Sequence, residues 1–262
     1  MNIKIFIILL LLFLSCKAQN GTEPMEQKEP IEQTEPITKP DSLGQTGTTE
    51  QSDTMKNSKS FSYLALGDSY TIGESVSEKE RYPNQFADSL RLLKYKIENP
   101  LIIARTGWTT DELNKGIDAV SPKGKYDLVT LLIGVNNQYR GRDTAEYRAQ
   151  FAQLLKRSIN YSALGNKGVI VISIPDWGAT PFAEDRNREL IAKQIDIFNK
   201  INKEESEKES VYYFDITGIS RQAVTSPELI ARDRLHPSGK MYQLWVKLFF
   251  DSAFNILKEG LK

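Results

Sequence analysis

The chain has a single histidine, His236, which lies three residues after Asp233 in the run Asp-Arg-Leu-His-Pro. Far upstream, Ser69 closes a Gly-Asp-Ser turn at the end of an apolar segment. A serine hydroxyl is a weak nucleophile at neutral pH and needs a neighbouring base, most often an imidazole that a carboxylate orients. These residue types therefore predict nucleophilic chemistry at Ser69, with His236 as the base and Asp233 as the orienting acid.

Two more short segments carry groups that such chemistry needs. Gly107 in Ala-Arg-Thr-Gly-Trp and Asn136 in Gly-Val-Asn-Asn each follow an apolar run of their own. Backbone N–H groups and side-chain amides at such positions can converge on the negative charge of a tetrahedral intermediate. A Gly-Asp-Ser turn alone is common in proteins. The order of the four segments along one chain is what favours catalysis.

With these four segments the chain resembles the SGNH (GDSL-type) esterases and lipases, which are named for a serine, a glycine, an asparagine and a histidine. The matching positions are Ser69, Gly107, Asn136 and His236, with Asp233 in the acid position. The resemblance spans roughly residues 60–255. It implies that Ser69 attacks an acyl carbonyl and that the oxyanion hole consists of the Ser69 and Gly107 N–H groups and the Asn136 amide. No cofactor is implied.

The third segment departs from the family pattern, which usually reads Gly-x-Asn-Asp. Its last position is Asn137 here, so no charge is available at that place. Adjacent residues on an extended segment point in opposite directions. We therefore expect only one of the two amides to face the oxyanion, and the resemblance assigns that role to Asn136.

From residue 60 onward, short apolar runs alternate with longer segments of helical periodicity. This pattern predicts an α/β domain in which helices cover both faces of a parallel sheet. The expected strands are 62–66, 100–104, 128–133, 169–174 and 211–216, and the expected helices are near 82–95, 110–119, 143–164, 184–206 and 238–258. The resemblance implies a three-layer sandwich with a five-stranded sheet of flavodoxin-like order 2-1-3-4-5.

Ligands of such open sheets bind beyond the carboxyl ends of the strands. Ser69, Gly107 and Asn136 follow the first three strands, so they are expected at one edge, and His236 precedes the last helix. Two other carboxylates, Asp215 and Asp176, end the last two strands and compete with Asp233 as the partner of the histidine. The three-residue spacing and the resemblance favour Asp233.

Aromatic residues follow three of the strands and form a possible substrate pocket: Trp108, Tyr139 and Trp177. Such side chains can stack on sugars or narrow an acyl pocket, and they can equally serve packing alone. A zinc site is not expected, because the sequence holds one histidine and one cysteine.

The first sixteen residues have the character of an export signal. Lys4 is followed by an apolar stretch over residues 5–14 and then by Ser15 and Cys16. About 20 apolar residues are needed to span a membrane, so this shorter stretch is interpreted as a signal peptide. Cys16 stands where a bacterial lipoprotein carries its lipidated cysteine. An ordinary secretory signal with an incidental cysteine is the alternative. We expect an exported protein anchored by lipid to the bacterial envelope, on the outer membrane, in the periplasm or at the cell surface.

Residues 17–59 are poor in large apolar side chains and contain a repeat of the type Glu-Pro-x-Glu-Gln-x. Such a segment cannot bury enough surface to offset its ordering entropy. We expect a disordered tether between the anchor and a hydrolase domain at residues 60–262. As a flexible coil it would span roughly 35–40 Å. A partner-binding role for the repeat is the alternative.

Charge excludes one class of partner. The formal net charge is +0 at pH 7, and no basic run is present, which argues against nucleic-acid binding. The expected partners are a small-molecule or glycan ester and the membrane, through the lipid anchor; no obligate protein partner is evident.

The sequence predicts an exported serine esterase for short acyl groups, such as those of acetylated glycans. A lysophospholipase or thioesterase acting on longer acyl chains is an alternative within the enzyme class. A non-catalytic surface lipoprotein that binds a glycan or a partner is the alternative of another class. It predicts that at least one essential group is missing, and the sequence lacks none of them.

The anchor can be tested by phase partitioning of the full chain. Lipid attached to Cys16 should carry the wild-type protein into the detergent phase, because a buried acyl chain gains about 0.8 kcal/mol per CH₂. Cys16→Ser should be released or left unprocessed. A wild-type protein found wholly in the aqueous phase would contradict the lipoprotein interpretation.

Overall fold

The computed structural model describes residues 59–261. The predicted signal peptide, Cys16 and nearly all of the predicted tether lie outside these residues, so those predictions stay predictions. None of the described helices combines the length and the apolar character that crossing a bilayer requires.

Five parallel strands form one sheet in the order β2-β1-β3-β4-β5. The strands are β1 (Tyr63–Gly67), β2 (Leu101–Ala104), β3 (Leu128–Leu132), β4 (Val169–Ile172) and β5 (Tyr212–Phe214). This confirms the predicted order 2-1-3-4-5, with strand ends that differ from the prediction by up to two residues. Every residue of β1, β3 and β4 is buried, as expected for strands that are covered on both faces.

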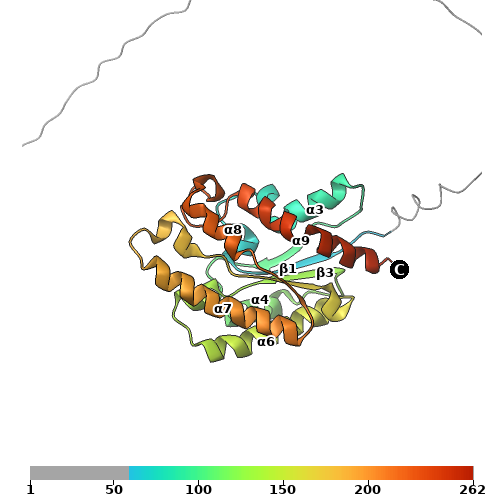
Figure 1. Cartoon of the computed structure of the whole chain (residues 1–262). Coiled ribbons are helices and arrows are strands. Elements are labelled where there is room, and N and C mark those ends of the chain that lie inside the picture. The colour runs from blue at the N-terminus through green and yellow to red at the C-terminus, as the bar shows by residue number, and fades with distance from the viewer. Residues whose placement is uncertain (1–58, 262) are drawn as a thin grey trace, which may run out of the picture. The chain divides into compact units, whose positions relative to one another are not determined.

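Helices cover both faces of the sheet, which confirms the three-layer sandwich. Figure 1 shows α3, α8 and α9 on one face and α4, α6 and α7 on the other. The long helices are α3 (Tyr82–Leu92), α4 (Thr110–Val120), α6 (Thr144–Tyr161), α7 (Arg188–Lys208) and α9 (Gly239–Glu259). A capping box of Thr109 and Glu112 starts α4.

Three short helices follow the carboxyl ends of strands: α2 (Ser69–Ile72) after β1, α5 (Val135–Tyr139) after β3 and α8 (Thr217–Arg221) after β5. Each has only one or two turns, too short for a periodic apolar pattern to predict. The expectation of an extended segment at Asn136 and Asn137 is therefore wrong, because both residues belong to α5.

The turn from β1 into α2 depends on Gly67. A Cβ atom at this position would lie 2.1 Å from Thr71 Oγ1 and 2.4 Å from the carbonyl oxygen of Leu132. Asp68 then caps α2 by accepting the backbone N–H of Tyr70 at 3.0 Å. Because the strand bends at once into the helix, Ser69 becomes the first helical residue, at the carboxyl edge of the sheet.

Candidate active site

Ser69, Gly107 and Asn136 arrive at one edge of the sheet because β1 lies between β2 and β3. Gly67 of β1 pairs with Ala104 of β2 and with Leu132 of β3. The loop before α9 brings His236 to the same place. These four residues line one cavity with a volume of about 210 Å³. The structure thus brings together the four residues that the sequence assigned to the reaction.

The imidazole of His236 is oriented by Asp233. Its Nδ1 lies 2.5 Å from Asp233 Oδ2, while Asp233 Oδ1 accepts the backbone N–H groups of Leu235 at 3.0 Å and His236 at 2.9 Å. The ring of Tyr70 packs against the imidazole, with 5.4 Å between the centroids. Since Nδ1 is engaged by the carboxylate, Nε2 is the nitrogen left to accept a proton from Ser69.

Asp233 is held in its ionised form. Partial burial alone would raise its pKa, but hydrogen bonds from the Ser75 hydroxyl, from the His236 backbone and ring and from the Leu235 N–H outweigh that effect and lower the pKa to about 2. Ser75 Oγ donates to Oδ2 at 2.6 Å, the same oxygen that contacts the imidazole. The carboxylate therefore remains charged at any pH near neutrality.

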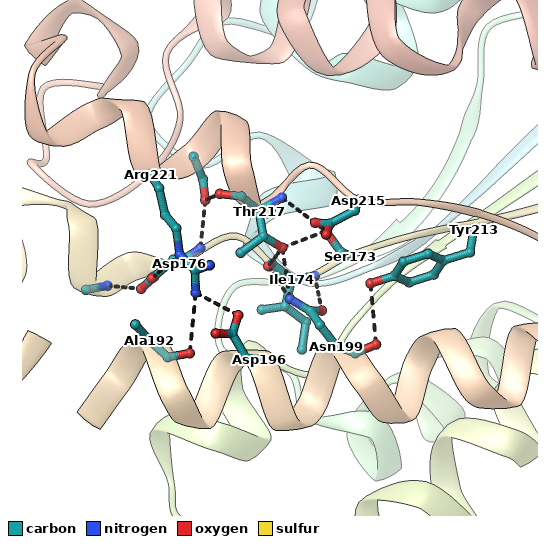
Figure 2. A network of polar contacts seen from close by, with 12 residues as sticks. Ser173, Ile174, Asp176, Ala192, Asp196, Asn199, Tyr213, Asp215, Thr217 and Arg221 are labelled. Carbon is teal, nitrogen blue, oxygen red and sulfur yellow. Dashed lines mark hydrogen bonds and ion pairs between the residues drawn. The ribbon is translucent and has the colours of Figure 1, made fainter. Parts of the chain in front are cut away.

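The competing acid Asp176 serves the loop after β4. Its side chain accepts the Gly178 N–H at 2.9 Å and Arg221 Nε at 2.9 Å, and Arg221 Nη2 reaches on to Asp196 at 2.7 Å, as Figure 2 shows. These contacts fix the short turn that begins at Trp177. Asp176 is thus engaged in holding a loop of the site.

The other competing acid, Asp215, belongs to the same polar network (Figure 2). Its Oδ1 accepts the Ser173 hydroxyl at 3.0 Å and the backbone N–H of Thr217 at 2.9 Å. Asn199 of α7 joins the network through the Thr217 hydroxyl, at 2.9 Å. Asp215 therefore ties β5 and α8 to β4, and the structure places Asp233 alone of the three carboxylates against His236.

Asp68, next to Ser69, is fully buried, and its pKa shifts in the opposite direction to that of Asp233. Burial raises its pKa to about 7, although backbone hydrogen bonds from Tyr70, Asp68 and Gly134 act to lower it. Below that pH the carboxyl group is largely neutral. Its side chain serves as the cap of α2.

The expected oxyanion donors occupy distinct environments. Gly107 has φ of 86°, in the left-handed region that glycine adopts without strain. Asn136 lines the cavity, and its Nδ2 donates one of its two hydrogens to the carbonyl of Trp108 at 3.0 Å. Asn137 is 2% exposed and turns away, toward Thr110, where it accepts the backbone N–H at 3.1 Å and donates to the hydroxyl at 2.8 Å. Asn136 and Asn137 therefore have separate tasks.

Two of the three predicted pocket aromatics line the cavity. Trp177 lies between Tyr139 and Phe182 in edge-on contacts of 5.3 and 6.0 Å between centroids, and all three line the cavity. Trp108 does not. Its ring lies over Gly116 of α4, whose missing side chain leaves room for the indole. Among residues 59–261, no group of three or more His, Cys, Asp or Glu side chains could hold a metal ion.

Sequence reasoning missed Ser75, Phe182 and Arg140. Ser75 follows the Gly73 cap of α2, and only its nearness to the nucleophile could have suggested a role. Phe182 lies beyond Trp177 in the same loop, so the aromatic pattern could have been extended to it. Arg140 is the C-cap of α5, and its contact with the Gly107 carbonyl, at 2.6 Å, has no signal in the sequence.

Comparison with known proteins decides the family. The model of the GDSL-like lipase/acylhydrolase family matches residues 65–244. The chain belongs to this family. It is accordingly a carboxylic ester hydrolase. No match was found among the curated proteins.

Three solved structures share the fold at low identity. The structure of TesA has a TM-score of 0.58 and 14% identity, with 74% of this chain and 99% of that chain covered. The psychrotrophic esterase EstA from Pseudoalteromonas sp., inhibited by monoethylphosphonate, has a TM-score of 0.55 and 18% identity, with 76% and 98% covered. An acetylxylan esterase from Geobacillus stearothermophilus has a TM-score of 0.56 and 18% identity, with 74% and 94% covered.

The separate environments of the two asparagines predict different effects of their removal. Asn136→Ala should lower kcat by about 10² to 10³ with a smaller change in KM, because the donor is aimed at charge that develops in the transition state. Asn137→Ala should act mainly on stability, since it leaves the buried Thr110 N–H unpaired at a cost of about 1–3 kcal/mol. Steady-state kinetics and thermal unfolding separate the two. A larger loss of kcat in folded Asn137→Ala would mean that the third segment is misassigned.

The pKa of Asp233 predicts how acid affects stability. An unfolded aspartate has a pKa of about 3.9, so a folded pKa of about 2 stabilises the native state above pH 4, and this contribution disappears as the pH falls toward 2. The melting temperature of the wild-type protein should therefore fall more between pH 5 and pH 2 than that of Asp233→Asn. Ser75→Ala should shift the loss to higher pH. Parallel melting curves for wild type and Asp233→Asn would contradict this assignment.

Proposed function

We propose that the protein is an exported, lipid-anchored serine esterase that removes short acyl groups, such as those of acetylated glycans, through an acyl-Ser69 intermediate. The observation that carries this proposal is that Ser69, His236, Gly107 and Asn136 line one cavity, while Asp233 contacts Nδ1 of the His236 imidazole. Family membership supplies the reaction class.

The reaction follows from these positions. As Ser69 Oγ attacks the acyl carbon, its proton passes to His236 Nε2, and the carbonyl oxygen takes up the negative charge. The Ser69 and Gly107 N–H groups and the Asn136 amide stabilise that charge. The C–O bond to the alcohol then breaks, and the alcohol leaves with the proton from His236. Water, deprotonated by His236, attacks the acyl-enzyme and releases the acid and free Ser69.

The size of the cavity favours short acyl groups. Its volume is about 210 Å³, and the side chains that bound it include Val135, Leu235 and Trp177. Trp177 Nε1 donates to Gln138 at 2.8 Å, and the turn that carries Trp177 is held by the bond from the Gly178 N–H to Asp176. A long acyl chain would have to displace these held groups or extend over the surface.

The rim of the cavity supports a carbohydrate as the alcohol part of the ester. Tyr139 is 51% exposed and Phe182 is 44% exposed, and both stand edge-on to the buried Trp177. Their free faces offer apolar platforms of the kind that pair with the C–H faces of sugar rings. The acetylxylan esterase with the same fold acts on such an ester by its name, which is consistent with this substrate class.

Export and anchoring rest on the sequence. The signal-like residues 1–16, the single cysteine Cys16 and the Glu/Pro-rich repeat support a domain tethered to the envelope. An ester of an extracellular or periplasmic glycan would be within reach of such a tether. A lysophospholipase or thioesterase that acts on longer chains remains the second candidate, because bilayer lipid would lie near the anchor.

A panel of acyl esters tests the function. With p-nitrophenyl esters of increasing length, kcat/KM should be highest for acetate or propionate and should fall for longer chains, because the cavity is short. Ser69→Ala should abolish turnover and also labelling by a fluorophosphonate probe, since the probe requires the nucleophile. Labelling that persists in Ser69→Ala would exclude Ser69, and rates that rise with chain length would favour the second candidate.

The proposed sugar-binding role of the exposed aromatic residues Tyr139 and Phe182 can be tested in the same way. On acetylated xylo-oligosaccharides, Tyr139→Ala and Phe182→Ala should raise KM, while on p-nitrophenyl acetate they should have little effect. Tyr212→Ala is the matched control, because Tyr212 is similarly exposed, at 45%, but belongs to β5 and does not line the cavity. Equal effects on both substrates would count against a sugar-binding rim.

A further inference from the structure

One face of α5 and the residue that follows it hold the loop that carries Gly107. Asn136 and Arg140 are four residues apart and therefore lie on the same side of the helix. Asn136 Nδ2 donates to the carbonyl of Trp108 at 3.0 Å, and Arg140 Nη2 donates to the carbonyl of Gly107 at 2.6 Å. Two consecutive peptide carbonyls are thus bound from the segment that follows β3.

The guanidinium of Arg140 is itself held from a second direction. Its Nη1 lies 3.3 Å from Glu112 Oε2, and the same oxygen accepts the backbone N–H of Thr109 at 2.8 Å and its hydroxyl at 3.0 Å. Glu112 therefore joins the N-terminus of α4 to Arg140. A hydrogen bond from a charged donor is about twice as strong as a neutral one, so the Gly107 carbonyl is a firmly held acceptor.

Gly107 needs such support from outside. It has no side chain to pack, and its φ of 86° is one that glycine adopts without strain. The peptide group after Gly107 is held at both ends: the Trp108 N–H donates to the carbonyl of Arg105 at 3.2 Å, and the Gly107 carbonyl accepts from Arg140. A Cβ atom at Gly107 would have a single near neighbour, Arg140 Nη2, at 3.7 Å. The Gly107 N–H lies in the preceding peptide group, so Arg140 restrains its direction through the backbone of Gly107, together with the bond from Trp108 to Arg105.

We propose that Arg140, braced by Glu112, is a positioning residue that fixes the Gly107 N–H of the oxyanion hole in register with the Asn136 amide. This inference rests on the proposed function. Arg140 acts through the carbonyl of Gly107 and touches neither the nucleophile nor the acyl group. Its loss leaves both donors in the protein and makes their alignment imprecise, which affects the transition state more than substrate binding.

A merely structural ion pair would behave differently. Exposed pairs contribute little to stability, and the chain offers a matched example in Arg142 and Glu146, 3.7 Å apart. The side chains of Arg140 and Arg142 are 42% and 41% exposed, so they differ mainly in the contact with Gly107. Arg142→Met is therefore the control for Arg140→Met.

The experiment compares Arg140→Met, Arg140→Lys and Arg142→Met in the full chain, with p-nitrophenyl acetate as the probe and Ser69→Ala as the blank. Arg140→Met should lower kcat by roughly 10-fold to 100-fold with KM changed less than about twofold, because misplacing a donor costs less than removing it. Arg140→Lys should recover part of kcat, since an ammonium can still donate to the carbonyl. Arg142→Met should match the wild type.

A second measurement does not depend on turnover. The carbonyl carbon of Gly107 should shift in the NMR spectrum of Arg140→Met and not in that of Arg142→Met. Equal kcat in Arg140→Met and Arg142→Met, with Ser69-dependent turnover in the wild type, would overturn this inference and leave the proposed function standing. A wild type without Ser69-dependent turnover would overturn both.

Discussion

The close approach of the backbone at Gly67 is the constraint on which the rest of the site depends. A side chain there would collide with Thr71 and with the backbone of β3, so only glycine allows β1 to turn directly into α2 while paired on both sides. The turn sets Ser69 at the first position of a helix, between the ends of β2 and β3. Gly107 and Asn136 leave those two strands, and their convergence on Ser69 follows from strand order alone.

The acidic residues of the site show how environment assigns roles to identical side chains. Asp68 is fully buried, burial raises its pKa to about 7, and its side chain caps α2 by accepting the Tyr70 N–H. Asp233 is partly exposed and receives donors on both oxygens, which lowers its pKa to about 2 and keeps a charge against the imidazole. Asp176 is paired with Arg221 and holds a loop. The three-residue spacing brings Asp233 to the histidine, and the hydrogen-bond donors around it keep it ionised.

The sequence predicted the sheet order, the strands and the long helices because buried strands and amphipathic helices leave periodic apolar patterns. It also placed Ser69, Gly107, Asn136 and His236 at one cavity, because parallel strands end at a common edge. The one-turn helix α5 was beyond such patterns, and an extended segment was expected in its place. The prediction that Trp108 lines the pocket was wrong for a related reason. The space over Gly116 that receives its ring arises from tertiary packing. Contacts between distant segments, such as Arg140 with Gly107, have no local signature.

The site is built in two parts. Ser69, Gly107 and Asn136 follow β1, β2 and β3, and the Asn136 amide donates to the carbonyl of Trp108, next to Gly107. Trp177 and Phe182 follow β4, and their loop is held by Asp176, Arg221 and Asp196, contacts that reach α7 and α8 (Figure 2). The two parts meet at α5, because Gln138 accepts the indole N–H of Trp177 two residues after Asn136, and Tyr139 contacts the Trp177 ring. A change in the loop after β4 can therefore reach the helix that carries Asn136 through these two contacts.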